Sequence, residues 1–218
     1  MSWWCGDRED HTLFKDFLKH LFPRVVLQQN LKISYTFCLG GLAFTALLLL
    51  ALSGLLLLFY YRPGTTEAYQ SIIFLEESVY GGKYLRNLHR LASHAFLLLI
   101  MLHTLRVILT GAFAPPRQRN WIIGVCLLGL AVFEAYTGYL LPMDQLALWA
   151  TQTGMTLIEA VPGGSLITVM LVPDHIGGPL SLIRFYVLHV VVLPLMTFGL
   201  CLLHFYQIRK QKGLLPYL

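Results

Sequence analysis

Four histidines lie in two matched pairs on long apolar runs of this chain. His89 and His103 are 14 residues apart, and His189 and His204 are 15 residues apart. Fourteen residues turn an α-helix through about 1400°, about 40° short of whole turns, and fifteen overshoot by about 60°, so each pair lies on one helix face. The rise of about 21–22 Å is most of the hydrocarbon thickness of a bilayer. If the two helices lie side by side, their histidines meet in two layers.

This arrangement of histidines points to a redox cofactor. An imidazole on each side of a flat macrocycle is the ligand set of a six-coordinate haem iron, and an ionisable side chain inside a membrane indicates a function by default. The alternative, four hydrogen-bonded core histidines, leaves the matched spacing unexplained. The sequence therefore predicts an all-α membrane protein, a four-transmembrane-helix bundle holding two stacked b haems, with His89 and His189 on one iron and His103 and His204 on the other.

The composition supports a membrane location and excludes several other classes. The 218 residues are 56% hydrophobic and only 12% charged, with a mean hydropathy of +0.65, whereas a soluble domain carries about 25% charged residues. None of the four cysteines forms a CxxC or CxxCH motif, which excludes a disulfide framework and an ordinary c-type haem motif. The net charge of +5 follows from membrane topology and requires no nucleic-acid partner.

Four stretches are long and apolar enough to cross a bilayer. Each ends in proline, glycine or basic residues, with aromatic residues near the ends, as is typical of membrane interfaces. The predicted spans are residues 33–61, 88–113, 121–141 and 182–208. We expect residues 31–218 to form one four-helix di-haem domain. We expect residues 1–30 to form an amphipathic N-terminal surface helix, with its candidate membrane-facing residues at Trp3, Trp4, Phe14, Phe17, Leu18 and Leu21.

Basic residues are distributed unevenly between the two sides of such a bundle. Four spans put both termini on one side, and 11 of the 16 Lys and Arg residues fall on that side. The positive-inside rule then places both termini on the cytoplasmic or negative side of a bacterial inner membrane or thylakoid. His89 and His189 would lie near the outer side, and His103 and His204 near the inner side.

The connection over residues 142–181 is long and contains several glycines and prolines, with Asp144, Glu159, Asp174 and His175. Connections of this length are usually functional or disordered. We expect short surface helices here, on the outer face, with His175 at the surface.

Glycines repeat the histidine spacing on the two other spans. Gly40 and Gly54 are 14 residues apart on the first span, and Gly124 and Gly138 are 14 apart on the third. A glycine has no side chain, so a flat macrocycle can approach the backbone there. The alternative is that these glycines serve only helix packing, for which glycine is common in membranes. Their match to the histidine spacing favours two notches at two haem levels.

Several polar residues lie close to the predicted haem levels. Haem propionates need cations, and the candidates are Arg86, Arg90, Arg106 and Arg184. Positive-inside bias explains Arg106 equally well. Glu134, inside the third span, either accepts a quinol proton or only hydrogen-bonds a neighbour. His94 follows His89 by five residues, about 140° around the helix, and is expected to face away from the haems.

Short motifs along the chain resemble those of the cytochrome b6 family, the haem-bearing subunit of cytochrome b6f and of split-type bacterial quinol:cytochrome c oxidoreductases. The resemblance covers residues 31 to the C-terminus, and the 15-residue spacing is that of the b6 branch. Two residues depart from the family pattern, Met143, where the family has tryptophan, and the acidic Glu134. The matching motifs are Cys38-Leu-Gly-Gly41, Phe59-Tyr-Tyr-Arg-Pro63, His89-Arg90, Thr110-Gly111, Thr137-Gly-Tyr139, Leu141-Pro142 with Asp144-Gln145, Arg184-Phe-Tyr186 with His189, and Ile208-Arg-Lys-Gln211.

The resemblance implies a di-haem cytochrome b subunit of a quinol:electron acceptor oxidoreductase in a respiratory or photosynthetic chain. Such a subunit carries electrons from an outer quinol-oxidation site to an inner quinone-reduction site in a proton-translocating Q cycle. It also implies a third haem, of c type, attached through one thioether at Cys38. The alternative is that Cys38 is only a small buried cysteine.

The family also implies partners. The PEWY motif of the quinol-oxidising site is absent from this chain, so a subunit IV-like companion must supply it, and the chain alone is not a complete enzyme. A Rieske-type iron–sulfur protein, a c-type cytochrome and a homodimeric complex are the other expectations. Two functions from other classes stay open: a di-haem anchor that passes electrons between a dehydrogenase or hydrogenase and quinone, and a haem-free scaffold or transporter. A b-type band in a reduced-minus-oxidised spectrum excludes the latter.

Overall fold

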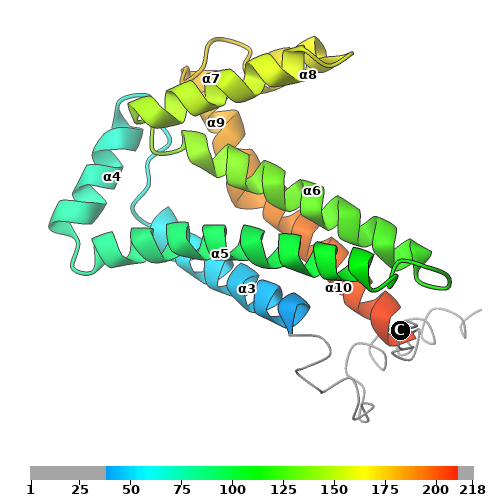
Figure 1. The fold of residues 1–218 in the computed structure, drawn as a ribbon. Helices are drawn as coiled ribbons and strands as arrows, with labels where there is room; N and C mark the ends of the chain where they lie inside the picture. The colour runs from blue at the N-terminus through cyan, green and yellow to red at the C-terminus, as the bar shows by residue number, and fades with distance from the viewer. Residues whose placement is uncertain (1–37, 211–218) are drawn as a thin grey trace, which may run out of the picture.

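The protein is described by a computed structural model over residues 38–210 (Figure 1), and every regular element in this range is helical. The predicted N-terminal surface helix over residues 1–30 lies outside the described residues, as do Gln211 and Lys212. The elements are α3 (Leu39–Leu58), α4 (Glu67–Ser78), α5 (Gly82–Leu109), α6 (Gln118–Leu140), α7 (Gln145–Glu159), α8 (Gly164–Leu171), α9 (Pro179–Val187), the π-helical turn η2 (Leu188–Val192) and α10 (Leu193–Lys210).

Four helical segments are long and apolar enough to cross a membrane, which confirms the predicted number of spans among the described residues. They are α3, α5, α6 and the continuous run of α9, η2 and α10. The second span begins at Gly82, six residues before the predicted start, because its first turns are polar and escape a search for apolar residues. It ends at Leu109, since Gly111 follows with a φ of 64°, the left-handed conformation that commonly terminates a helix.

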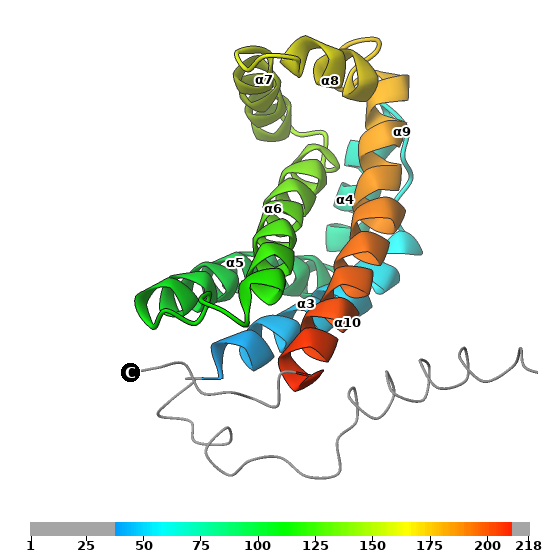
Figure 2. The same ribbon diagram turned by 90° about the vertical axis from the view of Figure 1, so that its right-hand side faces the viewer.

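The spans pack as two helix pairs, α3 against α5 and α6 against α10 (Figures 1 and 2). A central cluster of buried side chains joins the pairs, with Ala43 and Leu47 from α3, Phe96 from α5 and Ala131 from α6. Partly buried Phe198 from α10 packs against this cluster. The apolar contacts that are removed from solvent there stabilise the bundle at its middle.

The short helices gather at one end of the bundle, which we call the outer end. Figure 1 shows α4, α7 and α8 there, while the α5–α6 connection and the end of α10 lie at the opposite, inner end. The expected surface helices of residues 142–181 are thus present as α7 and α8. Helix α4 is an addition that the sequence analysis did not predict. Its buried residues Ala68, Ser71 and Leu75 share one face.

Hydrogen bonds from tyrosine hydroxyls connect the helices at the outer end of the bundle. Tyr61 donates to the Leu141 carbonyl over 2.7 Å and its ring stacks on Tyr186 at 5.6 Å between centroids. Burial, and then the neighbouring Tyr186, raise the pKa of Tyr61, so its hydroxyl keeps the proton that it donates. Tyr136 donates to the Thr151 carbonyl over 2.8 Å. The two hydrogen bonds connect the end of α3 to that of α6 and connect α6 to α7, and the stacked rings connect the end of α3 to α9.

Aspartates cap two of the outer helices. Asp144 accepts from the Ala147 N–H over 2.8 Å at the start of α7. Asp174 accepts from the Leu180 N–H over 2.9 Å at the start of α9, and its hydrogen bonds from Ser181 and then from Leu180 lower its pKa. Both carboxylates satisfy N–H groups that have no partner within their helix.

A π-helical turn interrupts the fourth span around His189, the first of its two paired histidines. The Leu193 N–H donates to the Leu188 carbonyl, five residues earlier. Pro194 has no N–H and its ring crowds the preceding turn, which favours the wider winding. A π turn takes up more residues than an α turn, so it absorbs the one residue by which the His189–His204 spacing exceeds 14. Both histidines thereby stay on one face.

Candidate di-haem site

Each of the four predicted glycines faces one of the four predicted histidines. A Cβ built on Gly54 would lie 3.2 Å from His89 Cε1, and one on Gly40 would lie 3.3 Å from His103 Cε1. On the other helix pair, a Cβ on Gly138 would lie 2.5 Å from His189 Cε1, and one on Gly124 would lie 3.5 Å from His204 Cε1. Each helix pair thus contributes one glycine and one histidine at each of two levels. We call His89, His189, Gly54 and Gly138 the outer level, and His103, His204, Gly40 and Gly124 the inner level.

Histidines from the two helix pairs meet across the bundle. The ring centroids of His89 and His189 are 6.4 Å apart, and the ring planes are inclined at 80°. Two imidazoles bound on opposite sides of one metal ion at about 2 Å have centroids about 6 Å apart. At the inner level, His103 and His204 are close enough to interact electrostatically. The outer pair therefore has the separation that an axially ligated haem iron requires.

Hydrogen bonds determine which ring nitrogen of the outer histidines is free. The Ser53 hydroxyl donates to the Leu49 carbonyl over 2.7 Å and lies 2.8 Å from His89 Nδ1. The Leu50 carbonyl, which can only accept, also lies beside the His89 ring, so Nδ1 carries the proton and the Ser53 oxygen accepts from it. His189 Nδ1 lies 2.9 Å from the Glu134 carbonyl, which can only accept. Both rings therefore carry their proton on Nδ1, which leaves the Nε2 lone pair for a metal.

The inner histidines have a sparser environment. His204 Nδ1 is buried and makes no hydrogen bond to the described part of the chain, although the Asn120 backbone carbonyl lies beside the ring. Arg106 lies close enough to His103 to interact electrostatically. The Phe205 ring packs on His204 at 6.4 Å and edge-on against Phe44 at 5.0 Å, between centroids. Besides Arg106 and the Asn120 carbonyl, aromatic side chains rather than hydroxyl groups lie around this level.

Of the four predicted arginines, Arg106 lies at the inner level beside His103, and the other three are in different situations at the outer end. Arg86 forms an ion pair with Glu76 of α4, and Arg184 is exposed and donates to the Met170 carbonyl of α8. Arg90 is exposed. Two of the four thus have partners within this chain at the outer end, and their pairing with propionates stays a prediction.

Three further residues from the sequence analysis have definite places. Cys38 is exposed at the N-cap of α3, with a φ of 49°, two residues before Gly40 of the inner level. His94 is exposed, as expected for a residue that faces away from the histidine levels. Glu134 Oε2 is buried without a hydrogen-bond partner among the described residues, as is Thr197 Oγ1. The role of Glu134 as a proton acceptor stays a prediction.

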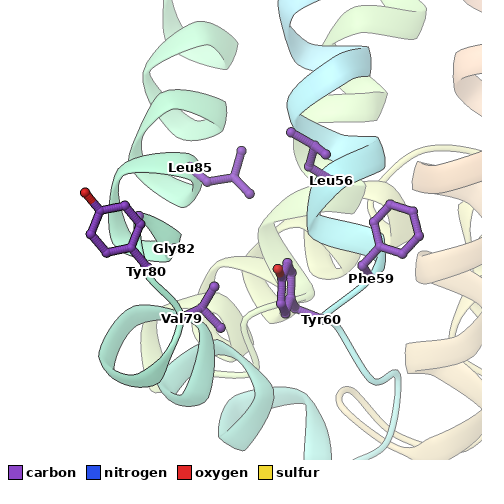
Figure 3. Close-up of a pocket in the computed structure, with 8 residues that line it drawn as sticks. Leu56, Phe59, Tyr60, Val79, Tyr80, Gly82 and Leu85 are labelled. Carbon is purple, nitrogen blue, oxygen red and sulfur yellow. The ribbon is translucent and has the colours of Figure 1, made fainter.

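An apolar pocket of about 310 Å³ lies at the outer end, between the end of α3 and the α4–α5 turn (Figure 3). Its lining contains none of the four histidines and no charged side chain. The lining residues are Leu56, Phe59, Tyr60, Val79, Tyr80, Gly81, Gly82 and Leu85. This pocket is therefore separate from the candidate di-haem site.

Four membrane-length helices with two levels of facing histidines and glycines define the class of membrane b-type cytochromes. The chain belongs to the cytochrome b/b6 family: the family model "Cytochrome b/b6/petB" matches residues 24–212. The chain is 36% identical over 211 residues to the "menaquinol:cytochrome c reductase cytochrome b subunit" of Geobacillus thermodenitrificans, covering 95% of this chain and 94% of the relative. It is 41% identical over 177 residues to the cytochrome b6 of Gracilaria tenuistipitata var. liui, covering 80% and 82%.

A solved structure has the same fold. The chain superposes on a chain of a "hyperthermophilic respiratory Complex III" with a TM-score of 0.75 and 23% sequence identity. The match covers 94% of this chain and 54% of that one, so this chain spans about half the length of the structural relative.

Proposed function

We propose that the outer level and the inner level each hold one haem b, with His89 and His189 as axial ligands of the outer haem and His103 and His204 as those of the inner one. The observation that carries the proposal is the facing of all four histidines by the four matched glycines. The 6.4 Å separation of the His89 and His189 rings supports it. The residues fit the cofactor, because a side chain at any of the four glycine positions would occupy space beside a ligand ring.

The residues of this chain have separate tasks in such a site. When bound, the haems supply one-electron oxidation and reduction at the two ends of the bundle. Ser53 and the Glu134 carbonyl hold the Nδ1 protons of the outer histidines. The central cluster around Ala43, Leu47 and Phe96 keeps the space between the levels apolar. Arginines at both ends are the proposed partners of the propionates.

We also propose the physiological setting of the chain. The names of the relatives support a role as the cytochrome b subunit of a quinol:cytochrome c type oxidoreductase, acting between an outer quinol-oxidation site and an inner quinone-reduction site in a Q cycle. A companion chain with the PEWY motif, a Rieske-type protein, a c-type cytochrome and a second copy of the complex are the proposed partners. Both termini face the negative side of the membrane in this proposal.

The test is haem stoichiometry on the complex purified with its partner subunits. We expect two acid-extractable haems b per chain, by pyridine haemochrome assay, and a b-type band in the reduced-minus-oxidised spectrum. A complex that contains this chain but no extractable haem b would overturn the proposal.

Cys38 offers a separate prediction about a covalent c-type haem. It is exposed, and it lies two residues from Gly40 of the inner level. We expect a haem-stained band near 25 kDa on a denaturing gel, matching the 24.7 kDa chain, and its complete loss in Cys38→Ser. Cys126→Ser is the matched control, because Cys126 is also exposed and has no assigned role. A stained band that survives Cys38→Ser would refute the attachment at this residue.

A further inference from the structure

We propose that Ser53 and Thr137 are positioning residues that lower the reduction potential of the outer haem relative to the inner one. The inference rests on the proposed ligation of two haems by the four histidines. It identifies the side chains beside the histidines that give the two levels different electronic environments.

The two hydroxyls occupy equivalent places on two different helices. Ser53 directly precedes Gly54, and Thr137 directly precedes Gly138. Ser53 Oγ lies 2.8 Å from His89 Nδ1, and Thr137 Oγ1 lies 3.3 Å from His189 Nδ1. Both side chains are buried, with 2% of Ser53 and 0% of Thr137 exposed. Each histidine thus meets the hydroxyl that precedes its facing glycine.

Both hydroxyls also donate to their own helix. Ser53 donates to the Leu49 carbonyl over 2.7 Å, and Thr137 to the Glu134 carbonyl over 3.0 Å. A backbone carbonyl, which can only accept, also lies beside each imidazole, so Nδ1 carries a proton and the hydroxyl oxygen acts as a second acceptor for it. In each case this carbonyl belongs to the residue four positions before the facing glycine. The Leu50 carbonyl lies beside the His89 ring, and the Glu134 carbonyl lies beside the His189 ring.

The inner level repeats the backbone part of this pattern without the hydroxyl. The Asn120 carbonyl, four residues before Gly124, lies beside the His204 ring. The residue directly before Gly124 is Ile123, and that directly before Gly40 is Leu39. Neither side chain can hydrogen-bond an imidazole, and His204 Nδ1 makes no hydrogen bond to the described residues.

The physical consequence follows from the direction of the bond. An acceptor on Nδ1–H gives the imidazole partial anionic character and raises its basicity as a metal ligand. A more basic axial ligand stabilises ferric over ferrous iron, so second-shell hydrogen bonding lowers the reduction potential. The outer level has one hydroxyl acceptor on each ring, and the inner level has none on its described neighbours. The outer haem is therefore expected to have the lower midpoint potential.

The test uses Ser53→Ala and Thr137→Val, singly and together, in the purified complex. Dye-mediated potentiometry, followed in the b-type absorbance band, gives the midpoint potentials of both haems. In the double variant we expect the one-electron equilibrium of the outer haem to shift about tenfold toward the reduced form. This shift corresponds to a rise of about 59 mV in the midpoint potential of the outer haem. Both haems should stay bound, because the Leu50 and Glu134 carbonyls remain beside the Nδ1 atoms. Ser53→Thr should restore the potential that Ser53→Ala alters.

A reciprocal variant adds the missing hydroxyl at the inner level. Ile123→Thr conserves the β-branched shape and places a hydroxyl directly before Gly124, so it should lower the inner potential and leave the outer one unchanged. Thr45→Val is the control, because the Thr45 hydroxyl donates to the Gly41 carbonyl and is not hydrogen-bonded to a histidine in the described part of the chain. Two bound haems with an unchanged outer potential in the double variant would overturn the inference. Absence of haem from the unaltered complex would instead overturn the proposed function.

Discussion

Leucine in place of His189 is expected to halve the b-type haem content of the complex, from two haems per chain to one. His189 supplies one of the two axial nitrogens of the outer level, and its partner ring, His89, lies 6.4 Å away between centroids. Leucine fills similar space but has no lone pair for a metal, so the outer iron would lose a ligand. The inner level uses a different pair and should keep its haem.

The measurement is a pyridine haemochrome assay combined with potentiometry, which identifies the haem that remains. His204→Leu should remove the other haem, so the two variants retain haems with different midpoint potentials. His94→Leu is the matched control, because His94 lies on α5 with His89 but is exposed. Two retained haems in His189→Leu, or haem loss in His94→Leu, would contradict the assigned ligands.

The number of spans could be predicted from the length of the apolar stretches, and the placement of the histidines and glycines in two levels could be predicted from helix periodicity. The pairing of particular glycines with particular histidines could not. Gly54 faces His89 because α3 packs on α5, and Gly138 faces His189 because α6 packs on α10. Which helices become neighbours is decided by tertiary packing, and the spacing is equally compatible with the opposite pairing.

Three features escaped the sequence analysis although a signal existed for each. Pro194 in the fourth span marks the π turn that accommodates the longer histidine spacing. The buried residues of α4 recur at helical intervals between Ala68 and Leu75, but the segment is too short and too polar to resemble a span. Ser53 and Thr137 precede the notch glycines, yet serines and threonines in membrane helices commonly bond only their own helix. Only the position of the imidazoles distinguishes these two hydroxyls from Thr45.

Alanine in place of Gly138 is expected to weaken binding of the outer haem, whereas alanine in place of Gly124 is expected to leave the inner haem bound. The new Cβ at position 138 would lie 2.5 Å from His189 Cε1 and 3.0 Å from its Nδ1. The Nδ1 atom of His189 is hydrogen-bonded to the Glu134 carbonyl, which lies 2.9 Å away on the same helix as Gly138. Moving the His189 ring away from position 138 would break this bond, which fixes the tautomer of the ring. At position 124 the nearest ring atom is 3.5 Å away, which is an ordinary contact.

Glycine-to-alanine substitution is therefore expected to weaken haem binding at position 138 but not at position 124, although both glycines lie on α6. The difference in haem binding shows how much the absence of a side chain at position 138 contributes. Overpacking of this kind costs about 1–3 kcal/mol, which corresponds to roughly five- to 150-fold weaker binding. Gly129→Ala is the control for backbone effects, because nothing lies within 4 Å of its Cβ position and alanine favours a helix over glycine by about 1 kcal/mol. Haem occupancy is measured at each level by redox titration during detergent dilution. Equal retention of the outer haem in Gly138→Ala and Gly129→Ala would mean that Gly138 serves helix packing and not the cofactor. Loss of the outer haem in Gly138→Ala alone would mean that haem binding requires the absence of a side chain beside the His189 ring.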